Sequence, residues 1–498
     1  MTKKQVVVVG GGLGGLSAAV ALAQKSFAVT LLEAQPHVGG YAVSFARQGW
    51  TFDPALHVTA AGGAGQEFRR LVDGLGLGEA VRFLPLAEGF RVRLGAFDFS
   101  LPNAYEAIFA RLADAFPEER EGLRRFRRDL EAHVGVYAPL FDADVSKWRS
   151  VPAFLPRLPA FLKHSATSTR DYLARFVRDP RLAALLFQCS VFMGIPADEF
   201  PAVNFMMMFH VLFGGGLSTL AGGGQSLSRA LERRLRELGG EIVCRCPVAR
   251  IGLAGGSAVS VQTGAGRVYA ADAVVAGVNL PTLAHEMIGD ENLPASWLNS
   301  LESLGPSLSV LVLSLGLDCA PREVGIDRHL TMVFPDADID ACMRRQRGGR
   351  AVEGFSVTAH GVTEPGIAPP ERSTVVVAAG TNPGAWIDLG EDEYRSAKRE
   401  TAAALMARLE PLYPGIGARV RVSDLATPRT MRRYTGNPSG AILGFACRMG
   451  VHRPLLAASD IPIRRLALAS AWTDKMGGFL QVVKAGVAAA EKTAKELR

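Results

Sequence analysis

A glycine-rich turn near the start of the chain constrains the fold more than any other feature. Four valines at 6–9 are typical of a buried strand in a parallel sheet, and the turn GGGLGG (10–15) follows them directly. The alanine-rich stretch 16–24 predicts a helix, and residues 28–33 predict a second strand. This order of strand, turn, helix and strand predicts the first unit of a doubly wound α/β fold.

The turn has the spacing of a dinucleotide-binding site. Gly10 allows the tight turn, Gly12 lets the backbone approach a pyrophosphate, and Gly15 lets the helix pack closely on the strand. The N-terminus of the helix offers free N–H groups to phosphates. Glu33, about 18 residues after the last glycine, stands where a carboxylate accepts hydrogen bonds from a ribose. A ligand-free turn is the alternative, but the complete context favours a nucleotide.

The paired glycines Gly39-Gly40 distinguish between the two common dinucleotides. Such a pair shortly after the ribose-binding acid is the pattern of FAD proteins of the glutathione-reductase type. Residues 467–491 predict a strand, a loop and a final helix that returns to the flavin. The sequence has no second GxGxxG with its own strand, helix and acid, so a separate NAD(P)H domain is not expected. We therefore expect FAD.

Further stretches of the chain match one flavoprotein pattern. They are 6–40, GWTFDPALHVTA (49–60), 222–251, 427–445 and 476–486. Together they resemble the phytoene desaturase, carotenoid isomerase and retinol saturase group of FAD oxidoreductases, within the wider amine-oxidase-like superfamily. The resemblance implies a Rossmann-type FAD-binding domain with an interleaved substrate domain of mixed sheet plus helices.

The resemblance also divides the chain. It implies a discontinuous FAD-binding domain made of residues 1–65, 222–285 and 460–498. The remaining residues, 66–221 and 286–459, would form the substrate-binding domain, with a helical, apolar part that faces a membrane.

Most of the expected cofactor-binding residues come from this resemblance. Three places depart from the family pattern: Tyr41 replaces a basic residue, Pro54-Ala55 replaces a glycine, and Asp474 stands in for the usual Gly-Asp or Gly-Glu. The full expected set is Gly10, Gly12, Leu13, Gly14, Gly15, Glu33, Ala34, Gly39, Gly40, Tyr41, Val248, Asp474, Gly477, Gly478, Gln481 and Val482.

An uncharged stretch, 200–228, is long enough to cross a bilayer. It contains Pro201 and six glycines, and a helix exposed to lipid would lose backbone hydrogen bonds there. We expect a large apolar interior and no transmembrane helix. Its methionines and phenylalanines fit an ordinary core equally well, but the resemblance suggests a tunnel for an isoprenoid or polyene. The expected wall residues are Met206, Met207, Met208 and Phe209.

Composition and charge exclude several classes. Six cysteines in 498 residues cannot form a disulfide scaffold, and the lone pair Cys244 and Cys246 gives no zinc site, so we expect no metal and a reduced, cytoplasmic protein. The net charge of +7 is spread over many elements, which argues against nucleic acid. Basic clusters at 124–128, 344–345 and 464–465 either contact anionic lipids as a peripheral membrane protein or form a solvated face.

The resemblance implies the chemistry. Hydride would move between flavin N5 and a substrate carbon while the neighbouring carbon loses or gains a proton. Desaturation, saturation and cis–trans isomerisation of a carotenoid or retinoid (CH-CH chemistry) all remain open, with oxygen or a quinone as electron acceptor or donor. His57 is the candidate proton carrier, although a structural histidine is the commoner case. The alternatives are a flavin amine oxidase and a non-enzymatic prenyl-binding protein of the escort type.

Overall fold

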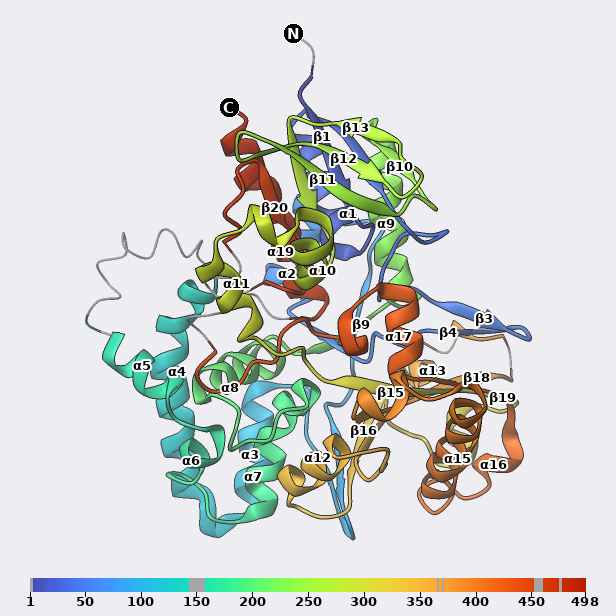
Figure 1. The fold of residues 1–498 in the computed structure, drawn as a ribbon. Coiled ribbons are helices and arrows are strands. Elements are labelled where there is room, and N and C mark those ends of the chain that lie inside the picture. Colours follow the sequence, from blue (N-terminus) through green and yellow to red (C-terminus); the bar gives the residue numbers. More distant parts are fainter. Residues whose placement is uncertain are drawn as a thin grey trace.

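The molecule has two parts, one above the other in Figure 1, and the predicted α/β fold class is confirmed. The upper part is built on a parallel sheet with helices on it, and the lower part on a larger mixed sheet beside a group of helices. The computed structural model describes residues 3–142, 156, 158–364, 367–369, 371–451, 460–473 and 477–498.

The parallel sheet brings together three distant segments of the chain. Its strand order is β10 (Glu241–Val243), β2 (Ala28–Leu32), β1 (Gln5–Val9), β14 (Ala273–Ala276) and β20 (Leu466–Leu468). All four strand pairs are parallel. The valines of β1 are buried on both faces of the sheet, which explains their uninterrupted run. The strand predicted at the start of the stretch 467–491 is present as β20, which is three residues long.

Helices α1 (Leu13–Gln24), α9 (Gly224–Glu237) and α19 (Phe479–Glu496) pack together against one face of this sheet. Helix α1 begins at Leu13, three residues before the predicted start, because the turn at 10–12 leads directly into the first helical residue. Gly486 lets α19 approach α1, since an added Cβ there would collide with the carbonyl oxygen of Gly14. The last segment of the chain thus lies against the first.

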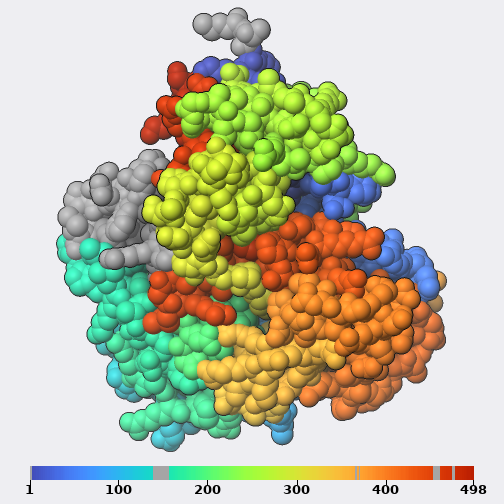
Figure 2. Space-filling view, in the orientation of Figure 1, coloured from blue at the N-terminus to red at the C-terminus, as the bar shows by residue number. Residues whose placement is uncertain are grey.

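A three-stranded antiparallel sheet covers the other face. It consists of β11 (Val248–Ala254), β12 (Ser257–Thr263) and β13 (Val268–Ala270). Strand β10 ends at Val243, because Arg245 has a left-handed backbone (φ 55°) and Pro247 lies two residues further on. In Figure 2 this sheet is the green lobe at the top of the molecule.

The lower part contains a seven-stranded mixed sheet, in which only the pair β16–β7 is parallel. Helix α15 (Glu391–Leu409) covers one of its faces. The strand order is β19 (Val420–Ala426), β15 (Ser309–Leu317), β18 (Ser373–Thr381), β17 (Phe355–Thr358), β16 (Leu330–Phe334), β7 (Arg91–Leu94) and β8 (Phe97–Ser100).

A group of helices forms the rest of the lower part, around a core of phenylalanines. The helical region that begins at Tyr105 is interrupted at Phe116 and Pro117, because proline cannot continue the first helix. The helices are α3 (Tyr105–Ala115), α4 (Arg120–Asp142), α5 (Leu158–Ser165), α6 (Thr169–Leu173), α7 (Pro180–Phe187) and α8 (Ala202–Phe209).

The uncharged stretch 200–228 is divided among several elements. It forms α8, the strand β9 (Leu217–Leu220) and the start of α9, with glycine turns between them. Among the described residues, no helix is long and apolar enough to span a bilayer. The interpretation of this stretch as apolar interior agrees with its burial.

The two main sheets come from different parts of the sequence. Every strand of the parallel sheet lies within the segments expected to bind FAD, and every strand of the mixed sheet lies outside them. The expected boundaries at 65, 222, 285 and 460 remain predictions.

Candidate functional site

A cavity of about 2700 Å³ runs from the ends of the parallel strands into the lower part. A site for one small molecule usually has about 300–1,000 Å³. This cavity therefore has room for a dinucleotide and a second, large ligand. It opens at the carboxyl ends of β1 and β2, the edge where doubly wound sheets bind nucleotides.

The glycine turn forms one end of the cavity. Gly10 has a left-handed backbone (φ 95°), and an added Cβ on Gly12 would meet no atom within 4 Å, so the cavity reaches the backbone there. Helix α1 points its N-terminus into this space from Leu13. Gly15 does not line the cavity. It lets α1 pack closely on β1, since a Cβ there would collide with the carbonyl oxygen of Gly10.

Glu33 lies beside this turn, only 8% exposed. Its Oε2 accepts the Gly11 N–H at 2.6 Å, and its Oε1 accepts the Gln35 N–H at 2.7 Å. An ionised carboxylate has about four acceptor positions, so two remain for ribose hydroxyls. The residues at this end therefore fit the adenosine and pyrophosphate of FAD.

The paired glycines bring a second loop over the turn. The N–H of Gly39 donates to the carbonyl of Gly11 at 2.7 Å, and Gly40 lies close to Gly12 with a left-handed backbone (φ 60°). No side chain at position 40 could occupy this space without approaching Gly12. The two loops together form a cradle made of backbone, as a pyrophosphate requires.

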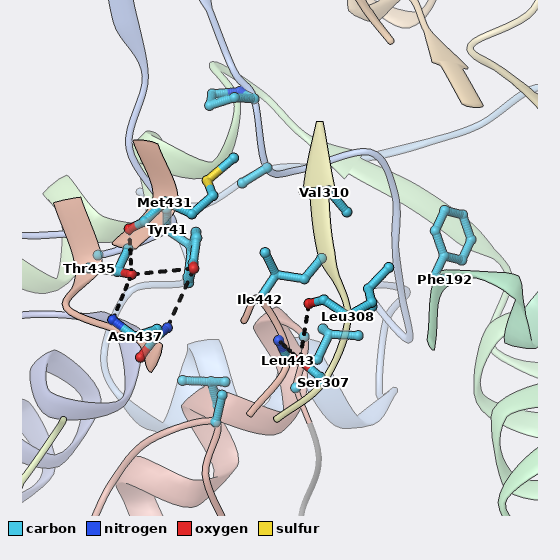
Figure 3. Close-up of a pocket in the computed structure, with 18 of the residues that line it drawn as sticks. Tyr41, Phe192, Ser307, Leu308, Val310, Met431, Thr435, Asn437, Ile442 and Leu443 are labelled. Atoms are coloured by element: carbon cyan, nitrogen blue, oxygen red, sulfur yellow. Dashed lines mark hydrogen bonds between the residues drawn. The ribbon is translucent and has the colours of Figure 1, made fainter. Parts of the chain in front are cut away.

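Tyr41 connects this loop to the lower part. Its hydroxyl donates to the carbonyl of Ala441 at 2.9 Å. It also lies 3.3 Å from Thr435 Oγ1 and 3.4 Å from Asn437 Nδ2, as Figure 3 shows. Burial raises the pKa of Tyr41 above its ordinary value. The phenol therefore stays neutral and serves as a hydrogen-bonding group.

The C-terminal segment forms the opposite wall of the upper cavity. Gly477, Gly478, Gln481 and Val482, at the start of α19, all line it. Val248 lines it from β11. Apart from Gly15, the expected residues of the first two loops line it too. Asp474 lies outside the described residues.

Several wall residues were not predicted from the sequence. Ser470 and Trp472 follow β20 and line the cavity. Leu308, Val310, Ile442, Leu443 and Phe192 form an apolar wall in the lower part, as Figure 3 shows. Val310 lies on β15, and its position on this wall depends on the pairing of β15 with distant strands.

Two of the four expected substrate residues require correction. Met207 and Met208 lie on the cavity wall, as predicted. Met206 and Phe209 are 0% exposed, belong to the helical core and do not line the cavity. The reason is helical geometry: positions three apart share a face of α8, and this face points away from the cavity.

His57 lines the cavity between the two parts. Its Nδ1 lies 2.7 Å from Thr358 Oγ1, and its carbonyl accepts a hydrogen bond from His329 Nε2 at 2.8 Å. Burial, and then repulsion from His360 and His329, lowers the pKa of His57 to about 3. The imidazole is therefore neutral at physiological pH, with Nδ1 held by threonine.

The carboxylates of the cavity are already paired. Among the described lining residues, every acid apart from Glu33 has a cationic partner. The pairs are Glu67 with Lys484 at 2.6 Å, Glu391 with Arg429 at 3.2 Å, and Asp424 with Arg47 at 3.5 Å. Apart from Glu33, a positively charged ligand would therefore find no carboxylate without a cationic partner on the described wall.

Comparison with known proteins identifies the family. Residues 13–494 match the flavin containing amine oxidoreductases. The chain belongs to this family. It is an FAD-dependent oxidoreductase, and the backbone cradle around Gly12 and Glu33 fits that cofactor.

Relatives within the family share almost the whole chain. The phytoene desaturase (lycopene-forming) of Paracoccus sp. is 26% identical, with 98% of this chain and 97% of that protein covered. The prolycopene isomerase 2 of an Oncidium hybrid is 24% identical, with 87% and 74% covered. A putrescine oxidase structure has a TM-score of 0.66 at 16% identity, over 99% of this chain and 98% of that one, and shares the fold.

Proposed function

We propose that this FAD-dependent oxidoreductase acts on the carbon–carbon bonds of a lipophilic isoprenoid, such as a carotenoid or retinoid. The observation that carries the proposal is the apolar wall, which continues directly from the FAD cradle. Met207, Met208, Phe192 and Leu443 belong to it. Flexible methionines and a rigid phenylalanine suit a long hydrocarbon, and the cavity volume leaves space for one beside the cofactor.

The pairing of the carboxylates supports a polyene over an amine. A protonated amine needs a negative partner or an aromatic cage in a buried site. The described acids near the lower cavity, Glu391 and Asp424, are already paired with arginine. The related phytoene desaturase and prolycopene isomerase, by their names, act on polyenes, which agrees with this choice.

Bound FAD would supply hydride acceptance or donation at its N5 atom. The proposed cofactor contacts are the lining residues of the upper cavity, with Glu33 on the ribose and the N-terminus of α1 on the pyrophosphate. His57 is the proposed proton carrier, because it is neutral and reaches the cavity between the two parts. The apolar wall would exclude water from the reacting carbons. Oxygen or a quinone would exchange electrons with the flavin.

Peripheral contact with a membrane is part of this proposal. Leu162, on α5, is 55% exposed and stands beside Lys163, a combination suited to an anionic lipid surface. The basic clusters contribute less charge than the sequence indicates, since Arg124 pairs with Glu121 at 3.0 Å and Arg345 with Glu353. Binding to anionic vesicles should weaken as salt is raised, and alkaline carbonate should release the protein.

Analysis of the ligand that copurifies with the protein tests the proposed function. The yellow protein is extracted with organic solvent, and the extract is examined by mass spectrometry together with the flavin spectrum. We expect FAD and an isoprenoid or polyene in the same preparation. An amine-derived product would contradict the proposal, and a colourless protein with a prenyl ligand would favour the escort-like alternative.

A further inference from the structure

We propose that Asp129, His133 and His164 bind a divalent transition-metal ion such as Zn²⁺, at a site separate from the FAD cavity. Asp129 and His133 lie one turn apart on α4, and His164 lies on the neighbouring helix α5 (Figure 1). One ligand atom of each side chain lies within 4.8 Å of the other two. None of the three lines the cavity described above.

The surrounding hydrogen bonds orient these side chains as metal ligands. His133 Nδ1 lies 2.8 Å from the backbone carbonyl of Asp129, so Nδ1 carries the proton and Nε2 keeps its lone pair. Tyr172 donates to Asp129 Oδ2 at 2.7 Å, and the Tyr137 hydroxyl lies 2.8 Å from His164 Nδ1. Outer hydrogen bonds of this kind, made to the ligand atom that does not contact the metal, usually orient the ligands of a metal site.

His164 is the buried member of the three side chains. Its ring is 4% exposed and meets the His133 ring edge to face, with centroids 4.7 Å apart. The Tyr137 hydroxyl occupies Nδ1, so Nε2 is the ring nitrogen left for a metal ion. Asp129 and His133 keep 29% and 27% of their side chains exposed, which gives an ion access from solvent.

Two imidazoles and one carboxylate are suitable ligands for Zn²⁺, and three protein ligands leave a fourth position for water. Bonds of about 2.0–2.1 Å in a tetrahedral site place ligand atoms about 3.3–3.5 Å apart, so small side-chain rotations would close the site. The ion would join α4 to α5, and both helices pack on α8, which carries Met207 and Met208. Metal binding would therefore stabilise one wall of the substrate cavity.

Metal content of the full-length, FAD-loaded protein without an affinity tag tests this site. After treatment with a chelator, the protein is dialysed against Zn²⁺ and then against buffer, and bound zinc is measured by mass spectrometry. We expect one zinc per chain and a melting temperature several degrees higher. Asp129→Asn and His133→Gln should lose both effects. Asparagine keeps an oxygen that accepts from Tyr172, and the flavin spectrum reports that each variant is folded.

His285→Gln is the matched control. His285 pairs with Asp290 at 2.7 Å in another part of the molecule and is more exposed than His133, so this variant should keep its zinc and its thermal shift. The proposal is overturned if the wild type retains no zinc. It is equally overturned if Asp129→Asn and His133→Gln retain as much zinc as His285→Gln.

Discussion

At the residue scale, Glu33 is the proposed ribose-binding residue. Its carboxylate orders both the Gly11 turn and residue 35, with acceptor positions left for the ribose. In Glu33→Gln the hydrogen bonds lose their charge. This costs about 1.5–3 kcal/mol, or about tenfold or more in the Kd for FAD. Flavin fluorescence titration measures the change. Glu79→Gln, at an exposed position, should bind like the wild type, and an unchanged Kd in Glu33→Gln would refute the ribose assignment.

The lowered pKa of His329 predicts that the free energy of unfolding depends on pH. Burial, then repulsion from His360, lowers its pKa to about 3 from an ordinary value of 6.5. The folded state therefore binds this proton more weakly than the unfolded state. Stability is full above pH 6.5 and falls as the pH drops from there toward 3. One such group contributes a slope of about 1.4 kcal/mol per pH unit in the free energy of unfolding.

His329→Gln should remove that contribution while its amide still donates to the carbonyl of His57. Chemical denaturation between pH 4 and 6 should give a slope shallower by about 1.4 kcal/mol per pH unit than in the wild type. Equal slopes in the two proteins would show that His329 is not held neutral by the fold.

At the element scale, one face of α8 lines the cavity and another packs in the helical core. Met208 lies on the cavity wall, whereas Met206 is wholly buried in the helical core. An unpaired buried carboxylate costs several kcal/mol. Met206→Asp should therefore lower the melting temperature strongly and cause loss of flavin. Met208→Asp should stay folded and yellow but lose polyene turnover. If both variants lose flavin alike, or if Met208→Asp turns over the polyene normally, α8 does not form the substrate wall.

Motifs formed by residues close together in the sequence could be predicted. The face that a helix presents to the cavity could not. The turn at 10–15, Glu33 and the paired glycines form a local pattern, so the FAD site could be assigned from it. The face of α8 could not, because α8 is almost uniformly apolar and both sides match a core. Likewise, Asp129 and His133 are visible as a pair one turn apart, but their third partner lies on another helix.

At the scale of the whole molecule, the two parts meet at the cavity. Tyr41 and His57 belong to the segments expected to bind FAD, yet their hydrogen-bond partners are Ala441 and Thr358 in the lower part. Long-range contacts of this kind depend on the packing of two sheets, and one sequence contains no local signal for them. They place the end of the FAD cradle beside the apolar wall, and the proposed function depends on that continuity.

Turnover of a polyene by the purified protein tests this account most directly. The FAD-loaded enzyme is incubated with an acyclic carotenoid in detergent micelles, once with oxidised and once with chemically reduced flavin. Products are separated by chromatography, and a parallel reaction with amines is monitored for peroxide. We predict that the polyene changes its number of double bonds or its cis–trans geometry in at least one state, with no peroxide from the amines. An unchanged polyene in both states, together with amine-dependent peroxide, would contradict the account.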